Sequence, residues 1–421
     1  MLSLLKILSV LFIIIPVRES VAQNINYKVI IRAEYPKIAT VTMNLPKRTK
    51  GHELYSRAGN NQTETQVRDV KCAGEIIEQD DDGRWFIPGQ CEEINWSVDF
   101  FHEDQEGIAA YEQKSILKKN SDWWIFSSPS ALLRLRREPP SLKISFDVPG
   151  QKYFKTSLSS SMSPPSYFAL GNVPSETIRR GGIKLTSISD DPSYTSQIIN
   201  IDDHLSALEY LSSIMGLNDT GEVRHITMIM IGIIRERQSL GGAAGSNAML
   251  VNYIFENEQS MDREKYYPVL IALHEQIHQL YRGSQLEWVE ESLAHYYGSK
   301  ALQRVYPDNK TINEIVEGLY TSTAEDIPGL VEIQRRIDEN RDFRLYDNFY
   351  NQGSAFWYNL DKLIHRFSDK HETLDDYLAI IMRSEFKRNE GIPNKVLRYL
   401  DFIPTDILHE LEEQYLFSGL N

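Results

Sequence analysis

The segment "IALHEQIHQLYRGSQLEWVEESLAHYY" (residues 271–297) constrains most strongly how this chain can fold. His274 and His278 are four residues apart, and helical positions i and i+4 share a face, so both imidazoles can reach one metal ion. Glu275 is turned about 100° from His274 around such a helix and stays free to act as a general base. The pattern H-E-x-x-H therefore predicts a zinc site. Two ordinary amphipathic helices are the alternative, because so short a pattern also recurs by chance.

A following helix offers a third ligand. Gly283 predicts the end of the first helix, and Ser284–Glu287 fits a capping box that starts the next one. If the two helices form a tight antiparallel hairpin, Glu291 lies at a height between the two histidines, since both helices rise about 1.5 Å per residue. We therefore expect His274, His278 and Glu291 to hold one zinc ion, with a fourth position left open.

The N-terminus has the features of a secretory signal peptide. Lys6 precedes an apolar run at residues 7–15, and small residues lead up to Ala22. We expect residues 1–22 to be cleaved and the protein to be exported, to a periplasm or out of the cell. The apolar run is shorter than the about 20 residues that span a bilayer, so no integral membrane segment is expected. A formal net charge of −14 argues against nucleic-acid binding.

The chain has only two cysteines, Cys72 and Cys91, and both lie in the part expected to be exported. Export favours an oxidising compartment, so a disulfide is expected between them. The residues between them are rich in turn formers, and the bond is expected to staple a hairpin.

Residues 23–160 read as a β-rich N-terminal domain. Apolar and polar residues alternate in four stretches, which is typical of half-buried strands: residues 27–35, 39–45, 94–101 and 141–148. A β-sandwich-like domain is the natural interpretation. The Ser- and Pro-rich residues 156–166 predict the domain boundary.

Residues 161–421 show a different pattern. Residues 202–216 have helical spacing and end on a glycine, whereas residues 224–234 and 246–255 are continuous apolar runs typical of strands. After about residue 262 the pattern is almost wholly helical. We therefore expect an α+β fold, in which a small sheet extends to about residue 256 and a helical C-terminal lobe follows.

The stretch "WVEESLAHYY" (residues 288–297) resembles the W-[LV]-x-E-G-x-A-x-Y pattern of gluzincin metallopeptidases, which include the membrane alanyl aminopeptidase and glycyl aminopeptidase families. The resemblance implies a thermolysin-like catalytic domain that hydrolyses peptides with zinc. It also implies that Glu291 is a zinc ligand. Ser292 replaces the glycine of the pattern, and the 12 residues between His278 and Glu291 are fewer than these families usually have.

A second stretch, "FYNQGSAFWYNLDKLIHRFSDKHETLDDYL" (residues 349–378), resembles a segment of glycyl aminopeptidases. Tyr350 falls on the tyrosine that in these relatives donates a hydrogen bond to the oxyanion of the transition state. The lysine of the family pattern is Gln352 here.

The position four residues after the ligand glutamate is an aspartate in thermolysin-like enzymes, where it orients a ligand histidine. In this chain it is His295. We expect His295 to lie behind the ligands or at the rim of the site. Asp361, Asp347 or a backbone carbonyl is expected to take over the orienting role.

Residues 240–253 are expected to form the edge strand along which an extended substrate binds. Gly241, Gly242, Asn247 and Ala248 are the residues that we expect to contact it. In aminopeptidases of these families a glutamate of this strand captures the free amine of the substrate. No acidic residue occurs in residues 240–253, which argues against a strict aminopeptidase and leaves an endopeptidase or an unusual exopeptidase.

The leading interpretation is thus an exported zinc-dependent metallopeptidase that acts on peptide or protein substrates. Glu275 and Tyr350 are its expected catalytic residues. Two alternatives stay open: a catalytically inactive protein that uses the peptidase fold for binding or as a scaffold, and a zinc hydrolase for non-peptide amides or epoxides.

Overall fold

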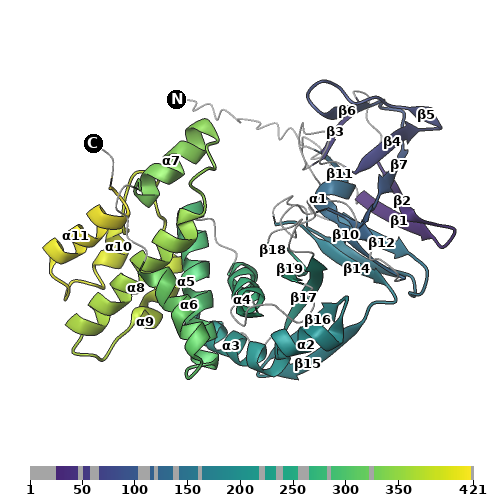
Figure 1. Cartoon of the computed structure of the whole chain (residues 1–421). Helices are drawn as coiled ribbons and strands as arrows, with labels where there is room; N and C mark the ends of the chain where they lie inside the picture. Colours follow the sequence, from purple (N-terminus) through teal and green to yellow (C-terminus); the bar gives the residue numbers. More distant parts are fainter. Residues whose placement is uncertain are drawn as a thin grey trace, which may run out of the picture.

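A computed structural model describes the following residues: 25–45, 51–56, 66–102, 114–117, 122–135, 142–159, 164–217, 223–233, 240–254, 265–281, 286–321 and 327–418. The chain forms several β-sheets followed by a helical C-terminal region (Figure 1), which confirms the predicted α+β class. The predicted signal peptide, residues 1–22, lies outside the described residues.

The first part of the described chain builds three sheets around one core. The largest has the spatial order β13 (Phe154–Leu158), β12 (Leu142–Asp147), β1 (Ile25–Arg32), β2 (Tyr35–Asn44), β7 (Glu93–Asp99), β4 (Val67–Cys72) and β5 (Glu75–Ile76). The second has the order β14 (Tyr167–Gly171), β10 (Trp123–Ser127), β9 (Ile116–Leu117) and β8 (Phe101–His102). The third has the order β11 (Leu133–Leu135), β3 (His52–Ser56) and β6 (Arg84–Ile87), and α1 (Ser128–Ala131) joins β10 to β11. Every second residue of β1 is buried in this core, as the alternation predicts.

The predicted domain boundary after residue 160 lies between β13 and β14. The Ser- and Pro-rich segment separates β13 from β14, but β14 pairs antiparallel with β10 and so belongs to the sheets of the first part. The strand that follows the predicted boundary at residue 160 thus shares a sheet with strands before it, and the boundary itself stays a prediction. The partner of β14 lies far back in the sequence, and local composition carries no information about such a pairing.

A five-stranded sheet follows, in the order β15 (Ser175–Arg180), β16 (Ile183–Ser189), β17 (Arg224–Ile233), β19 (Met249–Ile254) and β18 (Gly242–Ala244). Its three central strands are parallel, and both edge strands pair antiparallel. Met228 and Met230 of β17 join the core under the helices, whereas Ile229 and Ile231 join a cluster shared with the four-stranded sheet of the first part. Burial on both faces explains why β17 reads as an uninterrupted apolar run.

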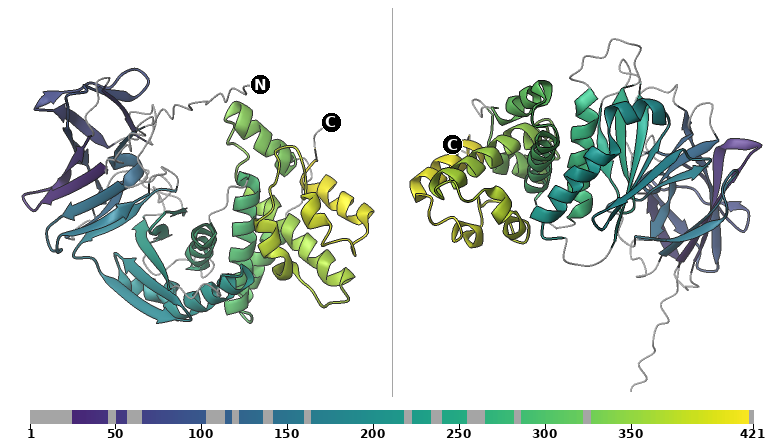
Figure 2. Two further views of the ribbon diagram at one scale, coloured as in Figure 1. Left: turned by 180° about the vertical axis from the view of Figure 1, so that it is seen from behind. Right: turned by 90° about the horizontal axis from the view of Figure 1, so that it is seen from below.

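The helices of the second part are α2 (Pro192–Ile198), α3 (Ile201–Ile214), α4 (Tyr266–Leu280), α5 (Glu287–Val305), α6 (Lys310–Tyr320), α7 (Leu330–Asn340), α8 (Asn348–Phe367), α9 (Leu374–Met382), α10 (Asn394–Leu397) and α11 (Thr405–Tyr415). In Figure 2 the helices α6 to α11 form a lobe on the side away from the first three sheets, with the five-stranded sheet and α4 between them. Within the described ranges no helix combines the length and apolar character needed to cross a membrane.

Cys72 and Cys91 form the expected disulfide. Cys72 ends β4, and Cys91 lies just before β7, the neighbour with which β4 pairs. The chain between them is more than a simple hairpin, because β5 pairs with β4 while β6 pairs with β3 in another sheet. The disulfide therefore closes a loop of the chain that contributes strands to two different sheets.

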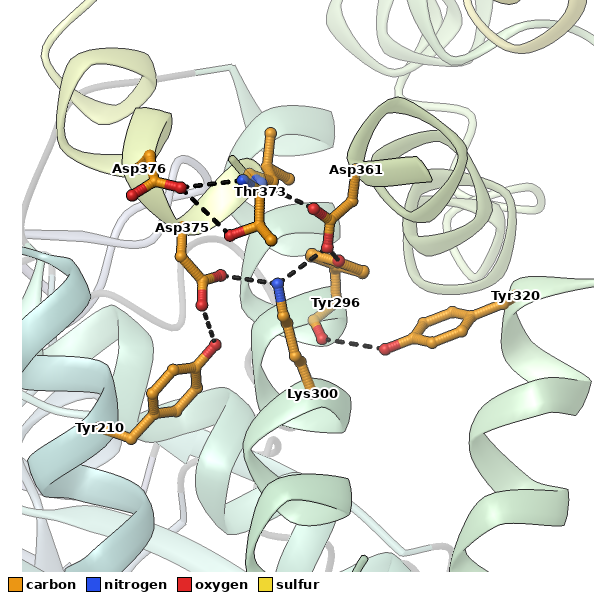
Figure 3. A network of polar contacts seen from close by, with 9 residues as sticks. Tyr210, Tyr296, Lys300, Tyr320, Asp361, Thr373, Asp375 and Asp376 are labelled. Carbon is orange, nitrogen blue, oxygen red and sulfur yellow. Dashed lines mark hydrogen bonds and ion pairs between the residues drawn. The ribbon is translucent and has the colours of Figure 1, made fainter. Parts of the chain in front are cut away.

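A polar network ties α5 to three other helices (Figure 3). Lys300 of α5 donates to Asp361 of α8 at 2.8 Å and to Asp375 of α9 at 2.7 Å. The hydroxyl of Tyr210, on α3, donates to the other oxygen of Asp375 at 2.8 Å. The side chains of Lys300, Asp361 and Asp375 are only 24%, 14% and 22% exposed. One lysine thus balances two poorly hydrated carboxylates where four helices meet.

We expect Lys300→Met to destabilise the protein, because it leaves both carboxylates without their cation. Breaking a fully buried pair costs about 3–5 kcal/mol, and the partial exposure here reduces this to about 2–3 kcal/mol. Urea unfolding of the variant and the parent measures the difference. The matched control is Lys310→Met, because Lys310 is 90% exposed in its pair with Glu314, and surface pairs contribute about 0–1 kcal/mol. Equal effects of the two substitutions would contradict a stabilising role for the network.

Candidate metal centre

The helices α4 and α5 cross each other. In Figure 1 α4 is seen almost along its axis while α5 runs up the picture, and the views of Figure 2 agree. The predicted antiparallel hairpin is therefore wrong. The helices approach closely at Gly298, where a Cβ atom would lie only 3.1 Å from the backbone nitrogen of His274. A glycine at this position lets the two backbones come together.

The ends of the two helices also differ from the prediction. α4 ends at Leu280, and α5 begins at Glu287 with Leu286 as its N-cap residue, which makes no side-chain capping bond. The helix thus starts later than predicted, since the capping box Ser284–Glu287 would have made Ser284 the N-cap residue. Gly283 and Ser284 lie outside the described residues.

The crossing brings Glu291 to the histidines of α4. Glu291 precedes Gly298 by seven residues, about two helical turns, so both face α4. Its Oε2 atom lies 3.1 Å from Nε2 of His274 and 3.6 Å from Nε2 of His278. The two imidazole Nε2 atoms are 3.1 Å apart. The structure therefore brings together the three residues that the sequence predicted as ligands.

This donor set fits a zinc ion. One ligand atom from each of His274, His278 and Glu291 lies within 4.8 Å of the other two. Tetrahedral zinc with bonds of about 2.0–2.1 Å keeps neighbouring ligand atoms about 3.3 Å apart, close to the distances found here. Two nitrogen lone pairs and a carboxylate oxygen that converge in this way need a proton or a cation between them.

Electrostatics supports the same conclusion. Burial lowers the pKa of His278, but the hydrogen bond and the charge of Glu291 outweigh it and raise this pKa to about 9. Burial alone would raise the pKa of Glu291, yet the two histidines hold it well below its usual range. Without metal, the site thus retains a proton where a cation would bind.

Glu275 points to the edge of the five-stranded sheet. A Cβ atom on Gly242 of β18 would lie 2.7 Å from Cγ of Glu275 and 2.7 Å from Cγ2 of Ile271. The backbone N–H of Ala244 donates to the Glu275 carboxylate, while burial raises its pKa. Glu275 is thus a poorly solvated carboxylate beside the ligands, which suits a group that accepts and returns a proton.

The four residues predicted to contact substrate fall into two pairs. Gly241 and Gly242 lie at the edge of the sheet, where β18 pairs with β19 on one side, beside Glu275. Asn247 and Ala248 are not at this site. The Asn247 amide accepts a hydrogen bond from the backbone of Tyr167 and donates one to it. Ala248 is 2% exposed and belongs to the cluster on the opposite face of the sheet.

Tyr350 lies in the first turn of α8, and its ring centroid is 5.5 Å from that of His274 and 5.3 Å from that of His295. Burial, followed by the charges of Glu291 and Glu275, raises the pKa of its phenol, so it stays protonated as a hydrogen-bond donor. The structure thus places Tyr350 against the ligands.

A second tyrosine at the site was not predicted. Tyr346 donates from its hydroxyl to Oε1 of Glu291 at 3.2 Å. It belongs to the turn before α8 and lies outside the stretch of family resemblance. The only signal in the sequence is the spacing of four residues between Tyr346 and Tyr350, which puts two residues on one face of a helix. This signal could be used only if the turn before α8 were known to be helical in shape.

No carboxylate orients His274 in the described part of the chain. The buried Nδ1 atom of His274 has no hydrogen-bond partner there, so neither Asp361 nor Asp347 takes the expected role. Asp361 is occupied by the Lys300 network. His295 does lie behind the ligands, with its ring centroid 5.6 Å from that of His274. Burial lowers the pKa of His295 to about 3, so it is neutral at physiological pH.

Zinc affinity should depend on pH. His278, with a pKa of about 9, must release its proton before it can bind a metal ion. Affinity should therefore rise with pH, by roughly tenfold per unit up to about pH 9 for this one proton. Calorimetric zinc titrations of metal-free protein from about pH 7 to about pH 8, in buffers of different ionisation enthalpy, measure both affinity and proton release. An affinity independent of pH, with no proton released, would contradict this account of the site.

Comparison with known proteins gives the fold a context. The structure is similar to that of an aminopeptidase N family protein from Idiomarina loihiensis, with a TM-score of 0.68 and 14% sequence identity over 94% of this chain and 77% of that chain. No protein-family model and no curated protein matches the sequence. At this identity the similarity concerns the fold alone. The chain therefore has an aminopeptidase N-like fold.

Proposed function

We propose that this protein is a zinc-dependent peptidase. The observation that carries the proposal is the convergence of His274, His278 and Glu291 within 4.8 Å of one another, beside a poorly solvated Glu275. A fold of the aminopeptidase N kind is consistent with this activity. Three protein ligands with a fourth position left open are typical of catalytic zinc rather than structural zinc.

A zinc ion held by these residues supplies Lewis-acid chemistry, which makes water more acidic and polarises a carbonyl. The chain supplies the proton transfers. Glu275 accepts a proton from the attacking water and passes it to the amine that leaves. Its raised pKa makes the returned proton easier to hold between the two steps. The phenol of Tyr350 donates a hydrogen bond to the oxygen on which negative charge develops.

The edge strand β18 is suited to an extended peptide. Among the described strands β18 is the last of its sheet, and an edge strand can pair with an extended peptide as one more strand, a mode of binding that needs a peptide backbone. The same feature favours a peptide over a non-peptide amide or epoxide as substrate. The absence of an acidic side chain from residues 240–253 leaves the amine of a peptide terminus without a partner on this strand. We therefore propose cleavage inside peptides, or exopeptidase action with another means of end recognition.

Export is part of the proposal. The N-terminal residues read as a signal peptide, and the Cys72–Cys91 disulfide agrees with an oxidising compartment. A protein that works outside the cytoplasm meets its peptide substrates there.

The decisive test is Glu275→Gln, measured together with metal content. The amide cannot accept the proton, so we expect hydrolysis of a peptide library to fall by about 10²–10⁴-fold or more. Zinc should stay bound in a one-to-one ratio, because Glu275 is not a ligand. Chelation should abolish the activity of the parent, and added zinc should restore it. Full activity of the variant would overturn the mechanism.

The approach of β18 to Glu275 gives a further prediction. A methyl group at position 242 displaces Glu275, so Gly242→Ala should lower kcat by about 10-fold or more, since a small misplacement of a catalytic group has large effects. Zinc content should not change. The control is Gly318→Ala, because nothing lies within 4 Å of a Cβ atom there. The idea fails if both variants keep the parent's kcat.

A binding or scaffold protein without catalysis is the second candidate. It is favoured by the same lack of an acidic side chain on the edge strand, which removes one of the substrate contacts of the enzymes that this chain resembles. Metal analysis separates the candidates, since purified protein without stoichiometric zinc points to the scaffold. Zinc-loaded protein that cleaves no member of a peptide library points to it as well.

A further inference from the structure

The two oxygens of the Glu291 carboxylate have different partners. Oε2 faces Nε2 of His274 at 3.1 Å and Nε2 of His278 at 3.6 Å. Oε1 instead accepts a hydrogen bond from the hydroxyl of Tyr346 at 3.2 Å. One oxygen is thus directed to the metal position, and the other is held away from it.

Tyr346 is well placed to fix this arrangement. Its ring lies 5.2 Å from that of Phe349 and 5.9 Å from that of Tyr350, measured between centroids. Phe349 is completely buried, so it is a rigid support for the phenol. A donor held by such packing limits the rotation of the Glu291 carboxylate about its last bond.

The role differs from that of Tyr350. The ring of Tyr350 packs against the imidazoles of His274 and His295, and its phenol lies within the field of both Glu291 and Glu275. Tyr346 has its hydroxyl on the far oxygen of Glu291. Both tyrosines, four residues apart, thus interact with Glu291, but Tyr346 holds Oε1 at 3.2 Å, whereas Tyr350 also packs its ring on two imidazoles.

We propose that Tyr346 is a positioning residue that holds Glu291 as a ligand through one oxygen, Oε2. The inference rests on the proposed zinc site. A ligand carboxylate that can rotate loses affinity by binding in several orientations, and it can also swing both oxygens onto the metal and occupy the position needed by water. Partners behind a ligand typically contribute about 10–100-fold to metal affinity.

The experiment compares Tyr346→Phe with Tyr350→Phe, which remove the same atom at neighbouring positions and keep both rings. Zinc affinity is measured by competition with a chromogenic chelator, and the visible spectrum is recorded after replacement of zinc by Co²⁺. We expect Tyr346→Phe to weaken zinc binding by about 10–100-fold and to change the Co²⁺ spectrum. Tyr350→Phe should weaken zinc binding and change the spectrum less than Tyr346→Phe does, while lowering kcat on any peptide that the parent cleaves. Thermal unfolding of the metal-free proteins checks that both variants fold alike.

The outcomes separate this inference from the proposed function. If the parent binds no stoichiometric zinc, the proposed function itself fails. If the parent binds zinc but Tyr346→Phe binds it equally well with an unchanged spectrum, the positioning role is overturned and the zinc site stands. Loss of kcat without loss of affinity in Tyr346→Phe would also overturn it, because Tyr346 would then act on substrate rather than through Glu291.

Discussion

The backbone contact between Gly298 of α5 and His274 of α4 sets the separation on which the site depends. Any side chain at position 298 would meet the backbone of α4, with its Cβ atom 3.1 Å from the His274 nitrogen. The close crossing lets Glu291, two turns earlier on the same face, reach the two imidazoles. Tyr346 then reaches Glu291 from the turn before α8. A backbone contact that takes no part in any reaction thus determines where the candidate ligands meet.

Contacts with other helices of the C-terminal region hold α5 in place. Ser292 stands where the gluzincin pattern that this stretch resembles has glycine, and its hydroxyl accepts a hydrogen bond from the indole of Trp357 at 2.7 Å. The opposing residue is Gly353, whose Cβ atom would lie 2.3 Å from that of Ser292, so the space that one helix fills is left free by the other. Further along α5, Lys300 ties the helix to α8 and α9. The departure from the family pattern is therefore compensated within the helical lobe.

Much of the fold and of the candidate site could be predicted from the sequence, and the predictions that failed did so for physical reasons. Periodicity identified the α+β class, and helical spacing put His274 and His278 on one face. Glu291 was selected through the gluzincin resemblance and through a hairpin that does not exist, and the second route still led to the right residue because crossing and antiparallel helices can both bring a residue level with its partners. Ala248 was expected to contact substrate because residues 240–253 were predicted as one edge strand, whereas they form β18, a short connecting segment that contains Ala248, and β19. Tyr346 and the pairing of β14 were missed because each depends on a partner distant in sequence.

The Lys300 network has a consequence for the order in which the protein is assembled. It joins four helices through side chains of the protein alone, so α5 is anchored whether or not an ion is present. Glu291 is thus carried on a helix that protein side chains hold in place, in contrast to small zinc domains that are unfolded without their metal. For the exported zinc peptidase proposed above, this means that the chain could fold first and bind zinc as a last step, after export. Its activity would then follow the supply of the ion in that compartment, independently of the rate at which the protein is made.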